Sequence, residues 1–364
     1  MLDDKIFTFN SYMKTKFGGR VARISMSTGF DCPWNKCIFC RKESFSPNVS
    51  VDMTKADRLD TLERSMNFLK NRYGNKFFAA YFQSGTSTFG DKEILAKMYR
   101  EAASIKGVVA MIFSTRPDYL GKDEIDLILG NVPENIDEIW IELGLQSTND
   151  NSLKWINRGH DAACYFKAVE NVEKYGQNKI KVAPHIILGL PGETKEDMLS
   201  TVLQSTQSPV VKGLKLHHLQ IHNCTPLEKI YAENPFPLLS VEKYIKITAE
   251  IIAKLPRDLV LFRLFTTALL NTSSLRSGIS EHRKRCANSR NIWTRTTSRK
   301  GVKNSKCEKN FISEFRQILF RLLPQLFELF KRLAPFDEGW INVFHLVETR
   351  LELFSAPFES LFAV

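Results

Sequence analysis

Short apolar segments alternate with amphipathic segments along the first 264 residues of this 364-residue chain. Strands are expected at 21–25, 77–83, 108–114, 138–145, 179–188, 213–219 and 259–264. Helices are expected between them, near 54–73, 92–105, 122–130, 161–175, 195–208 and 241–255. A regular strand–helix alternation is typical of a parallel sheet covered by helices. The pattern therefore predicts an α/β protein.

Polar or glycine-rich segments follow six of the predicted strands. These segments are the loop after 21–25 and residues 83–88, 114–118, 146–147, 189–193 and 217–218. The carboxyl ends of parallel strands meet on one face, and α/β enzymes bind their ligands there. We therefore expect these segments to form one active site.

Three cysteines, Cys32, Cys37 and Cys40, lie within nine residues after the first predicted strand. Closed zinc and iron–sulfur sites usually take four protein ligands, so three thiolates leave one coordination position open for chemistry. The alternative is a zinc site that a distant His or Cys completes. The other cysteines are expected to be free thiols, as in a reducing compartment; they are Cys164, Cys224, Cys286 and Cys307.

The cysteine cluster resembles that of the radical S-adenosylmethionine (radical SAM) superfamily. Phe39 precedes the third cysteine as in that family, although four residues rather than the commoner three separate the first two. Further segments resemble an uncharacterised bacterial branch related to oxygen-independent coproporphyrinogen oxidase and to the catalytic subunit of elongator. They are residues 81–88, 114–118, 142–147, 156–161, 185–194 and 215–217.

The resemblance implies a partial (β/α)6 barrel of the TIM type over residues 1–264. It implies that Cys32, Cys37 and Cys40 hold a [4Fe-4S] cluster whose fourth iron binds S-adenosylmethionine. Reductive cleavage of this cofactor would give a 5′-deoxyadenosyl radical, with flavodoxin or ferredoxin as a low-potential electron donor. The substrate stays open between a tRNA and a small molecule.

The resemblance also implies cofactor contacts at Gln83, Thr86, Arg116, Glu142, Gln146, Arg158, Gly189 and Gly192. The segment that begins at Gln83 lacks the carboxylate of the family's Gly-Gly-Glu-like sequence, so its contacts would be polar side chains and backbone carbonyls. Gln146 and Arg158 match cofactor-binding positions of the porphyrin-oxidase-like members, and an Arg suits the cofactor's carboxylate. Glu142 would either contact the cofactor or form an ion pair with Arg116 or Arg158.

The strand expected at 213–219 carries two candidate catalytic residues. Side chains alternate between the two faces of a strand, so Lys215 and His217 are expected to point into the barrel and His218 away from it. Lys215 and His217 are then candidates for substrate contact. His185 lies in an apolar strand and is expected to be a core or barrel-facing histidine.

The chain changes character after residue 264. Residues 264–310 contain eleven Lys and Arg against two acids, which accounts for most of the net charge of +11. We expect a flexible, basic, Ser/Thr-rich linker at 265–310 and a Phe/Leu-rich helical tail at 311–364. The related branch continues differently here, so this region is either a lineage-specific extension or a product of a shifted reading frame.

The basic stretch leaves a second functional hypothesis, a non-catalytic zinc-binding or RNA-binding module. The chain has no stretch of about 18 uncharged apolar residues and no signal-peptide pattern at its start. A cytoplasmic protein without a membrane segment is therefore expected.

Overall fold

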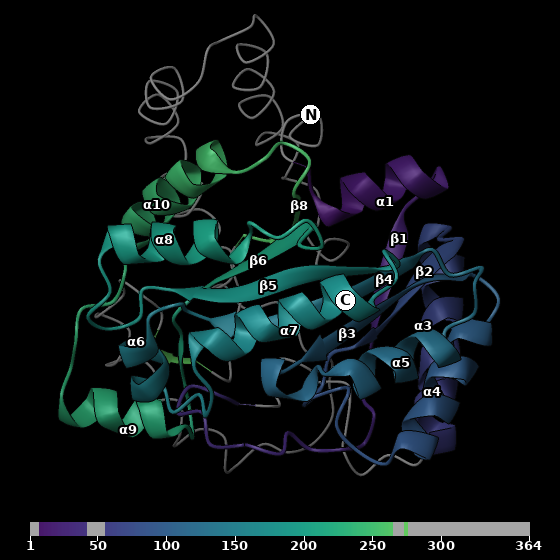
Figure 1. Cartoon of the computed structure of the whole chain (residues 1–364), viewed down its shortest axis with the longest axis horizontal. Coiled ribbons are helices and arrows are strands. Elements are labelled where there is room, and N and C mark those ends of the chain that lie inside the picture. The colour runs from purple at the N-terminus through teal and green to yellow at the C-terminus, as the bar shows by residue number, and fades with distance from the viewer. Residues whose placement is uncertain (1–6, 42–54, 265–272, 276–364) are drawn as a thin grey trace, which may run out of the picture.

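The computed structural model describes residues 7–41, 55–264 and 273–275 (Figure 1). Seven parallel strands form one sheet in the order β1-β2-β3-β4-β5-β6-β8. They are β1 (Val21–Met26), β2 (Phe77–Phe82), β3 (Val108–Thr115), β4 (Glu138–Gln146), β5 (Ile180–Leu188), β6 (Gly213–His218) and β8 (Val260–Arg263). The sheet curls into a partial TIM barrel, which confirms the predicted α/β fold class.

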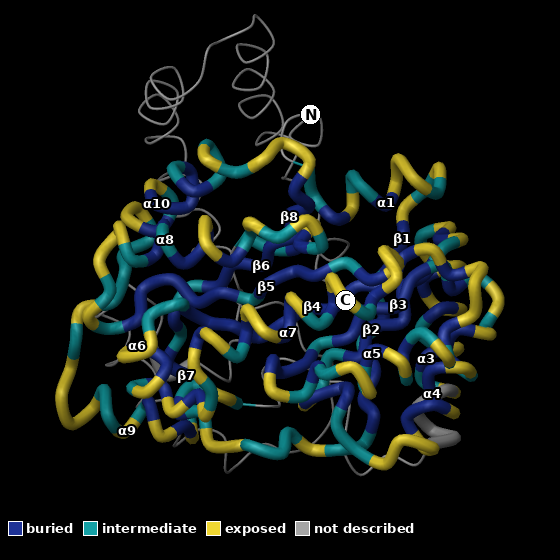
Figure 2. The backbone as a smooth tube through the Cα atoms, in the orientation of Figure 1, coloured by how far each residue is buried: buried dark blue, intermediate teal, exposed yellow. Residues whose placement is uncertain are grey.

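Helices follow the first six strands and cover the outer face of the sheet. They are α3 (Lys55–Tyr73), α4 (Lys92–Ser104), α5 (Lys122–Asn131), α7 (Ala162–Tyr175), α8 (Lys195–Ser205) and α10 (Val241–Lys254). Every residue of β4 is buried, because helices cover one of its faces and the barrel interior covers the other. Figure 2 shows this burial pattern, with buried strands and exposed outer helix faces.

Shorter elements lie between the main ones: α1 (Phe9–Phe17), the 3-10 turn η2 (Pro117–Tyr119), α6 (Asp150–Trp155), β7 (Ile221–His222), α9 (Pro226–Glu233) and β9 (Ser273–Leu275). Local capping sets where the helices begin. At the start of α8, the Thr194 hydroxyl accepts from the Asp197 backbone N–H at 3.1 Å, and the Asp197 carboxylate accepts from the Thr194 N–H at 2.8 Å. This reciprocal pair satisfies two N–H groups that have no partner inside the helix.

Helix α1, which the alternation did not predict, packs over the amino-terminal end of the barrel. Its Phe9 lies 4.6 Å from Phe262 of β8 and 6.3 Å from Trp140 of β4, between ring centroids. Gly213 makes room for this cluster, because a Cβ there would lie 2.8 Å from Phe262 and 3.0 Å from Trp140. The apolar plug leaves the carboxyl ends of the strands as the open end.

The predicted linker at 265–310 and the predicted helical tail at 311–364 lie almost wholly outside the described residues. Within the linker, β9 pairs antiparallel with β7, with Leu275 opposite Ile221. The linker at 265–310 stays a prediction. In the part of the chain that the structure describes, no helix is both long and apolar enough to cross a membrane.

Candidate active site

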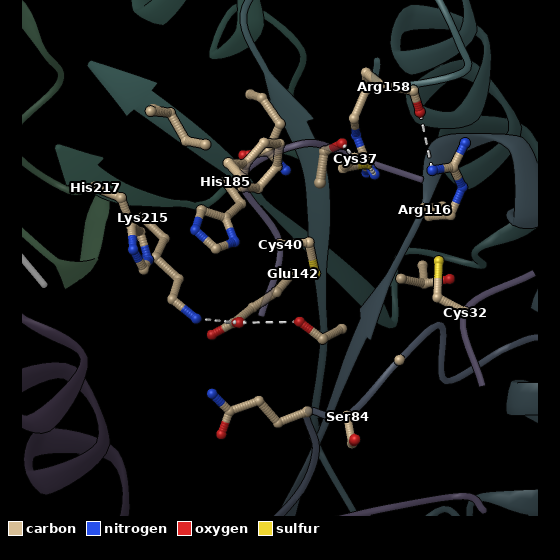
Figure 3. A pocket seen from close by; sticks show the side chains of 18 of the residues that line it. Cys32, Cys37, Cys40, Ser84, Arg116, Glu142, Arg158, His185, Lys215 and His217 are labelled. Carbon is tan, nitrogen blue, oxygen red and sulfur yellow. Dashed lines mark hydrogen bonds and ion pairs between the residues drawn. The ribbon is translucent and has the colours of Figure 1, made fainter. Parts of the chain in front are cut away.

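A pocket opens at the carboxyl ends of the strands (Figure 3). Ten of the predicted site residues line it: Cys32, Cys37, Cys40, Gln83, Arg116, Glu142, Gln146, Arg158, Lys215 and His217. Three predicted residues are not among the residues that line it: Thr86, Gly189 and Gly192. Segments more than 180 residues apart in sequence thus meet at one site, as expected for the carboxyl ends of parallel strands.

The three predicted ligand cysteines all reach this pocket from one loop. Cys32 and Cys37 are half-buried and Cys40 is exposed. Burial opposes ionisation of Cys32, but a hydrogen bond to the Asn35 backbone and the charge of Arg116 bring its pKa below the usual thiol value. Among the described residues, no three His, Cys, Asp or Glu side chains converge as ligands of a single metal ion would.

The cysteine loop is held in place by the turn after α6. The Trp34 indole donates to the Asn157 carbonyl at 2.7 Å, and the Asn157 side-chain amide donates to the Lys36 carbonyl at 2.9 Å. Gly159 has φ of +80°, and the Trp34 ring lies so close that a Cβ at Gly159 would be 2.4 Å from it. The turn therefore fixes the loop through two hydrogen bonds and a close ring contact.

Alanine at Gly159 should loosen the cysteine loop. The substitution forces a side chain onto left-handed backbone and pushes Trp34 away, so we expect a loss of about 1–3 kcal/mol in the free energy of unfolding and less bound iron after reconstitution. Urea unfolding and iron analysis measure both. Gly130→Ala is the matched control, because a Cβ there has no atom within 4 Å. Unchanged stability and iron content in Gly159→Ala would contradict this role of the turn.

Two arginines lie beside the cysteine loop, and neither pairs with Glu142. The Arg116 guanidinium makes two 2.8 Å contacts with the Asp118 carboxylate. Arg158 donates to the Gly144 carbonyl at 2.7 Å and lies 3.5 Å from the Cys37 sulfur. The predicted alternative of an ion pair between Glu142 and Arg116 or Arg158 is therefore wrong.

The partner of Glu142 is Lys215. Their side chains meet at 2.7 Å inside the barrel (Figure 3). The Tyr81 hydroxyl donates to the Glu142 carboxylate and accepts from the Lys215 ammonium at 2.9 Å. Burial alone would raise the pKa of Glu142, but the charges of Lys215 and Arg23 lower it to about 2. Burial lowers the pKa of Lys215 to about 8 despite the charge of Glu142. The pair remains ionised near neutral pH.

Two histidines lie next to each other in the pocket. Figure 3 shows the two labelled rings of His185 and His217 next to each other. Their centroids are 4.0 Å apart. Burial lowers the pKa of both rings well below the usual value, and the charge of Lys215 lowers both further. Lys215 and His217 line the pocket, as the strand alternation predicted. The His218 ring packs against Tyr244 of α10, but His218 is also among the residues that line the pocket.

The remaining predicted residues lie in tight turns beside the pocket. Thr86 is fully buried. Gly189 and Gly192 have φ of +87° and +85°, which favours glycine at both positions. A Cβ at Gly189 would lie 2.7 Å from Leu239, so the close approach at this glycine is to a protein side chain.

Sequence reasoning missed three pocket features: Tyr81, Arg263 and the nearby Arg23. Tyr81 lies two residues before Gln83, and the two-residue period of a strand would have placed both on one face. The sequence predicted only that Arg263 lies near the end of the strand at 259–264 and that Arg23 lies in the strand at 21–25. Arg23 and Arg263 lie on the first and last strands of the sheet, so neither position is marked as a pocket position by local sequence.

Comparison with known proteins agrees with this geometry. Residues 26–204 match the family model described as the radical SAM superfamily, and residues 211–282 match the radical SAM C-terminal domain. An uncharacterized protein of Methanocaldococcus jannaschii is 32% identical over 261 residues, which cover 70% of this chain and 79% of that protein. YhcC of Escherichia coli K12 is 31% identical over 267 residues, which cover 71% of this chain and 83% of that protein.

Among solved structures, the archaeal Elp3 of Methanocaldococcus infernus is similar at 18% identity with a TM-score of 0.49, over 67% of this chain and 55% of that one. The two relatives above are each more than 30% identical and are covered over more than two thirds of their length. The chain therefore belongs to the radical SAM superfamily.

Proposed function

We propose that the protein is an enzyme that uses a [4Fe-4S] cluster, held by Cys32, Cys37 and Cys40, to cleave S-adenosylmethionine reductively. The observation that carries the proposal is that all three cysteines line one pocket at the open end of the barrel. Members of the superfamily are generally enzymes and typically bind this cluster and this cofactor. When both are bound, one electron from the reduced cluster would cleave S-adenosylmethionine into methionine and a 5′-deoxyadenosyl radical.

The residues around the thiols fit a ligand with charged and polar groups. The Nε atom of Arg158 and the Oε1 atom of Glu142 are buried beside the pocket, and neither has a hydrogen-bond partner among the described residues. Buried polar groups without partners are unfavourable, so each favours a ligand that supplies one. Thiolates are also the donors that iron–sulfur clusters take.

The roles of these residues follow from their chemistry. Arg158 would bind the carboxylate of the cofactor's methionine end, because a guanidinium matches a carboxylate with two parallel donors. Its polar neighbours would satisfy the ammonium and the remaining oxygens; they are Gln83, Thr86, Arg116, Glu142 and Gln146. The turn containing Gly189 and Gly192 would lie toward the adenine and ribose. Lys215 and His217 would contact the substrate deeper in the barrel.

Electrons would come from a low-potential donor such as flavodoxin or ferredoxin. Cys40 is the exposed member of the three cysteines. Its exposure supports access of such a donor to the cluster from the open end of the barrel. A tRNA and a small molecule are both substrates compatible with a pocket at this position.

Replacing Arg158 by lysine tests the cofactor role. In the full-length protein with a reconstituted cluster, Arg158→Lys should weaken S-adenosylmethionine binding about tenfold, because a single ammonium replaces a planar pair of donors. Isothermal titration measures the affinity, and iron analysis of the same sample should give the wild-type value. Arg64→Lys, on an exposed face of α3, is the matched control. Wild-type affinity in Arg158→Lys would assign Arg158 to holding Gly144 and the cysteine loop alone.

A further inference from the structure

A second set of contacts, from the start of α9, also holds the cysteine loop. The Ile38 N–H donates to the Ile156 carbonyl just after α6, and the Ile38 carbonyl accepts from the Leu227 N–H of α9, both at 3.0 Å. The three side chains are buried and belong to one apolar cluster. Because Ile38 lies between Cys37 and Cys40, these contacts hold the middle of the ligand segment from two sides.

Two further hydrogen bonds hold the Cys40 end of this segment. The Cys40 N–H donates to the Cys37 carbonyl at 3.2 Å, which closes a turn between the two cysteines. Arg41 follows directly, and its guanidinium donates to the Asn223 carbonyl at 3.0 Å. Asn223 comes immediately after β7. The Arg41 bond therefore ties the end of the cysteine loop to the segment that leads into α9.

The turn that carries Asn223 is ordered by its own side chains. The Thr225 hydroxyl donates to the His222 carbonyl at 2.7 Å and accepts from the Glu228 N–H at 3.3 Å. The Glu228 carboxylate accepts from the Cys224 N–H at 2.9 Å. Thr225 is thus the N-cap of α9. We call residues 223–228 the α9 turn, which presents a fixed backbone to the cysteine loop.

Cys224 has left-handed backbone within the α9 turn. Its φ is +62°, which is uncommon for a residue with a side chain and persists only where surrounding contacts hold it. The angle φ at Cys224 sets the orientation of the Asn223–Cys224 peptide relative to α9. This backbone conformation therefore directs the Asn223 carbonyl toward Arg41.

We propose that Arg41 and the α9 turn position Cys40 for cluster binding. This inference rests on the proposed function, since it assigns a positioning role toward the same cluster. Loss of the contacts that orient a metal ligand typically lowers metal affinity about 10- to 100-fold. Cluster binding then depends on a carbonyl 182 residues beyond Arg41 as well as on the cysteines themselves.

Variants of Arg41 test the inference on the full-length protein with its reconstituted cluster. Arg41→Met keeps the length of the side chain but removes its donors, so it should release iron to a chelator about tenfold faster than the wild type. Arg41→Lys keeps one donor group and should recover part of this loss. Arg257→Met, at an exposed position shortly before β8, should release iron as the wild type does. Wild-type iron release in Arg41→Met would overturn the inference.

A matched pair of variants at Cys224 tests the α9 turn without changing Arg41. Both Cys224→Gly and Cys224→Val remove the thiol, but glycine accepts left-handed backbone and valine opposes it. Cys224→Val should release iron about tenfold faster than the wild type, whereas Cys224→Gly should keep the wild-type rate. Equal rates of iron release in the two variants would contradict the role of the α9 turn.

Amide hydrogen exchange separates positioning from general stability. In Arg41→Met and Cys224→Val, exchange should be faster over residues 37–41 and 223–228 and unchanged over 92–104, which form α4 on the outer layer. The electron paramagnetic resonance spectrum of the reduced cluster should change in both variants. Exchange that is faster to the same extent in all three segments would assign both positions to stability alone and overturn the inference.

Iron content of the wild-type protein distinguishes this inference from the proposed function. A wild-type protein that binds no iron–sulfur cluster after reconstitution would refute the proposed function, and the positioning role with it. A wild-type protein that holds its cluster, with wild-type iron release in both Arg41→Met and Cys224→Val, would refute the positioning role alone.

Discussion

Alanine at Cys32, Cys37 or Cys40 is expected to abolish the iron–sulfur cluster. Each of these cysteines reaches the same pocket, and a methyl group cannot replace a thiolate ligand. Each variant should lose the visible absorbance of the cluster and its electron paramagnetic resonance signal after anaerobic reconstitution. Activity that depends on the cluster should fall to background with it.

Cys164→Ser and Cys224→Ser are the controls for this expectation. Cys164 is half-buried on α7, Cys224 is exposed, and neither is among the residues that line the pocket. Both variants should keep the wild-type iron content. A full cluster in Cys37→Ala would show that the ligand set is misassigned.

Glutamine at Glu142 is expected to cost about 3–5 kcal/mol in the free energy of unfolding. The substitution leaves Lys215 buried without its partner, close to the cations Arg23 and Arg263. Urea unfolding of the full-length protein measures the loss. The double variant Glu142→Gln, Lys215→Met should recover part of it, because it removes the uncompensated charge as well.

An exposed pair provides the comparison. Glu196 lies 3.7 Å from Lys195 on the surface of α8, and Glu196→Gln should change the free energy of unfolding by less than about 1 kcal/mol. A loss in Glu142→Gln no larger than in this control would contradict a stabilising role for the buried pair.

The pKa of Glu142 also sets a pH window for the pair. Its pKa is about 2 in the folded chain against the ordinary value of 4.5, so the folded state favours the ionised form. The stabilisation is present above pH 4.5 and is lost as the pH falls from about 4.5 toward 2.

The strands of the sheet and the helices that cover it could be predicted from the sequence, because local patterns of residues specify them. Apolar runs such as 138–145 and capped helices such as the one after Thr194 specify their own structure, and each predicted strand lies within about two residues of the observed one. Helix α1 was missed because its nine residues gain their stability from contacts with Trp140 and Phe262, which are far away in sequence. Local patterns do not contain such contacts.

Some site residues could also be predicted from local sequence, and others could not. The cysteines, Lys215 and His217 could be placed at the pocket from strand order and two-residue alternation alone. The partner of Glu142 could not be predicted, because Lys215 lies 73 residues away in sequence and two arginines, Arg116 and Arg158, were the expected candidates. Arg158 was expected to contact the cofactor, and the structure adds that the turn beside it, at Asn157 and Gly159, contacts Trp34 of the cysteine loop.

If the three cysteines hold the cluster, the protein should cleave S-adenosylmethionine reductively. The most direct measurement is the amount of 5′-deoxyadenosine formed per full-length protein, anaerobically reconstituted and supplied with S-adenosylmethionine and dithionite, beside Cys37→Ala. We expect about four irons per wild-type protein, formation of 5′-deoxyadenosine and methionine, and neither product from Cys37→Ala. One bound zinc, or a fully iron-loaded protein that forms no 5′-deoxyadenosine, would contradict this expectation.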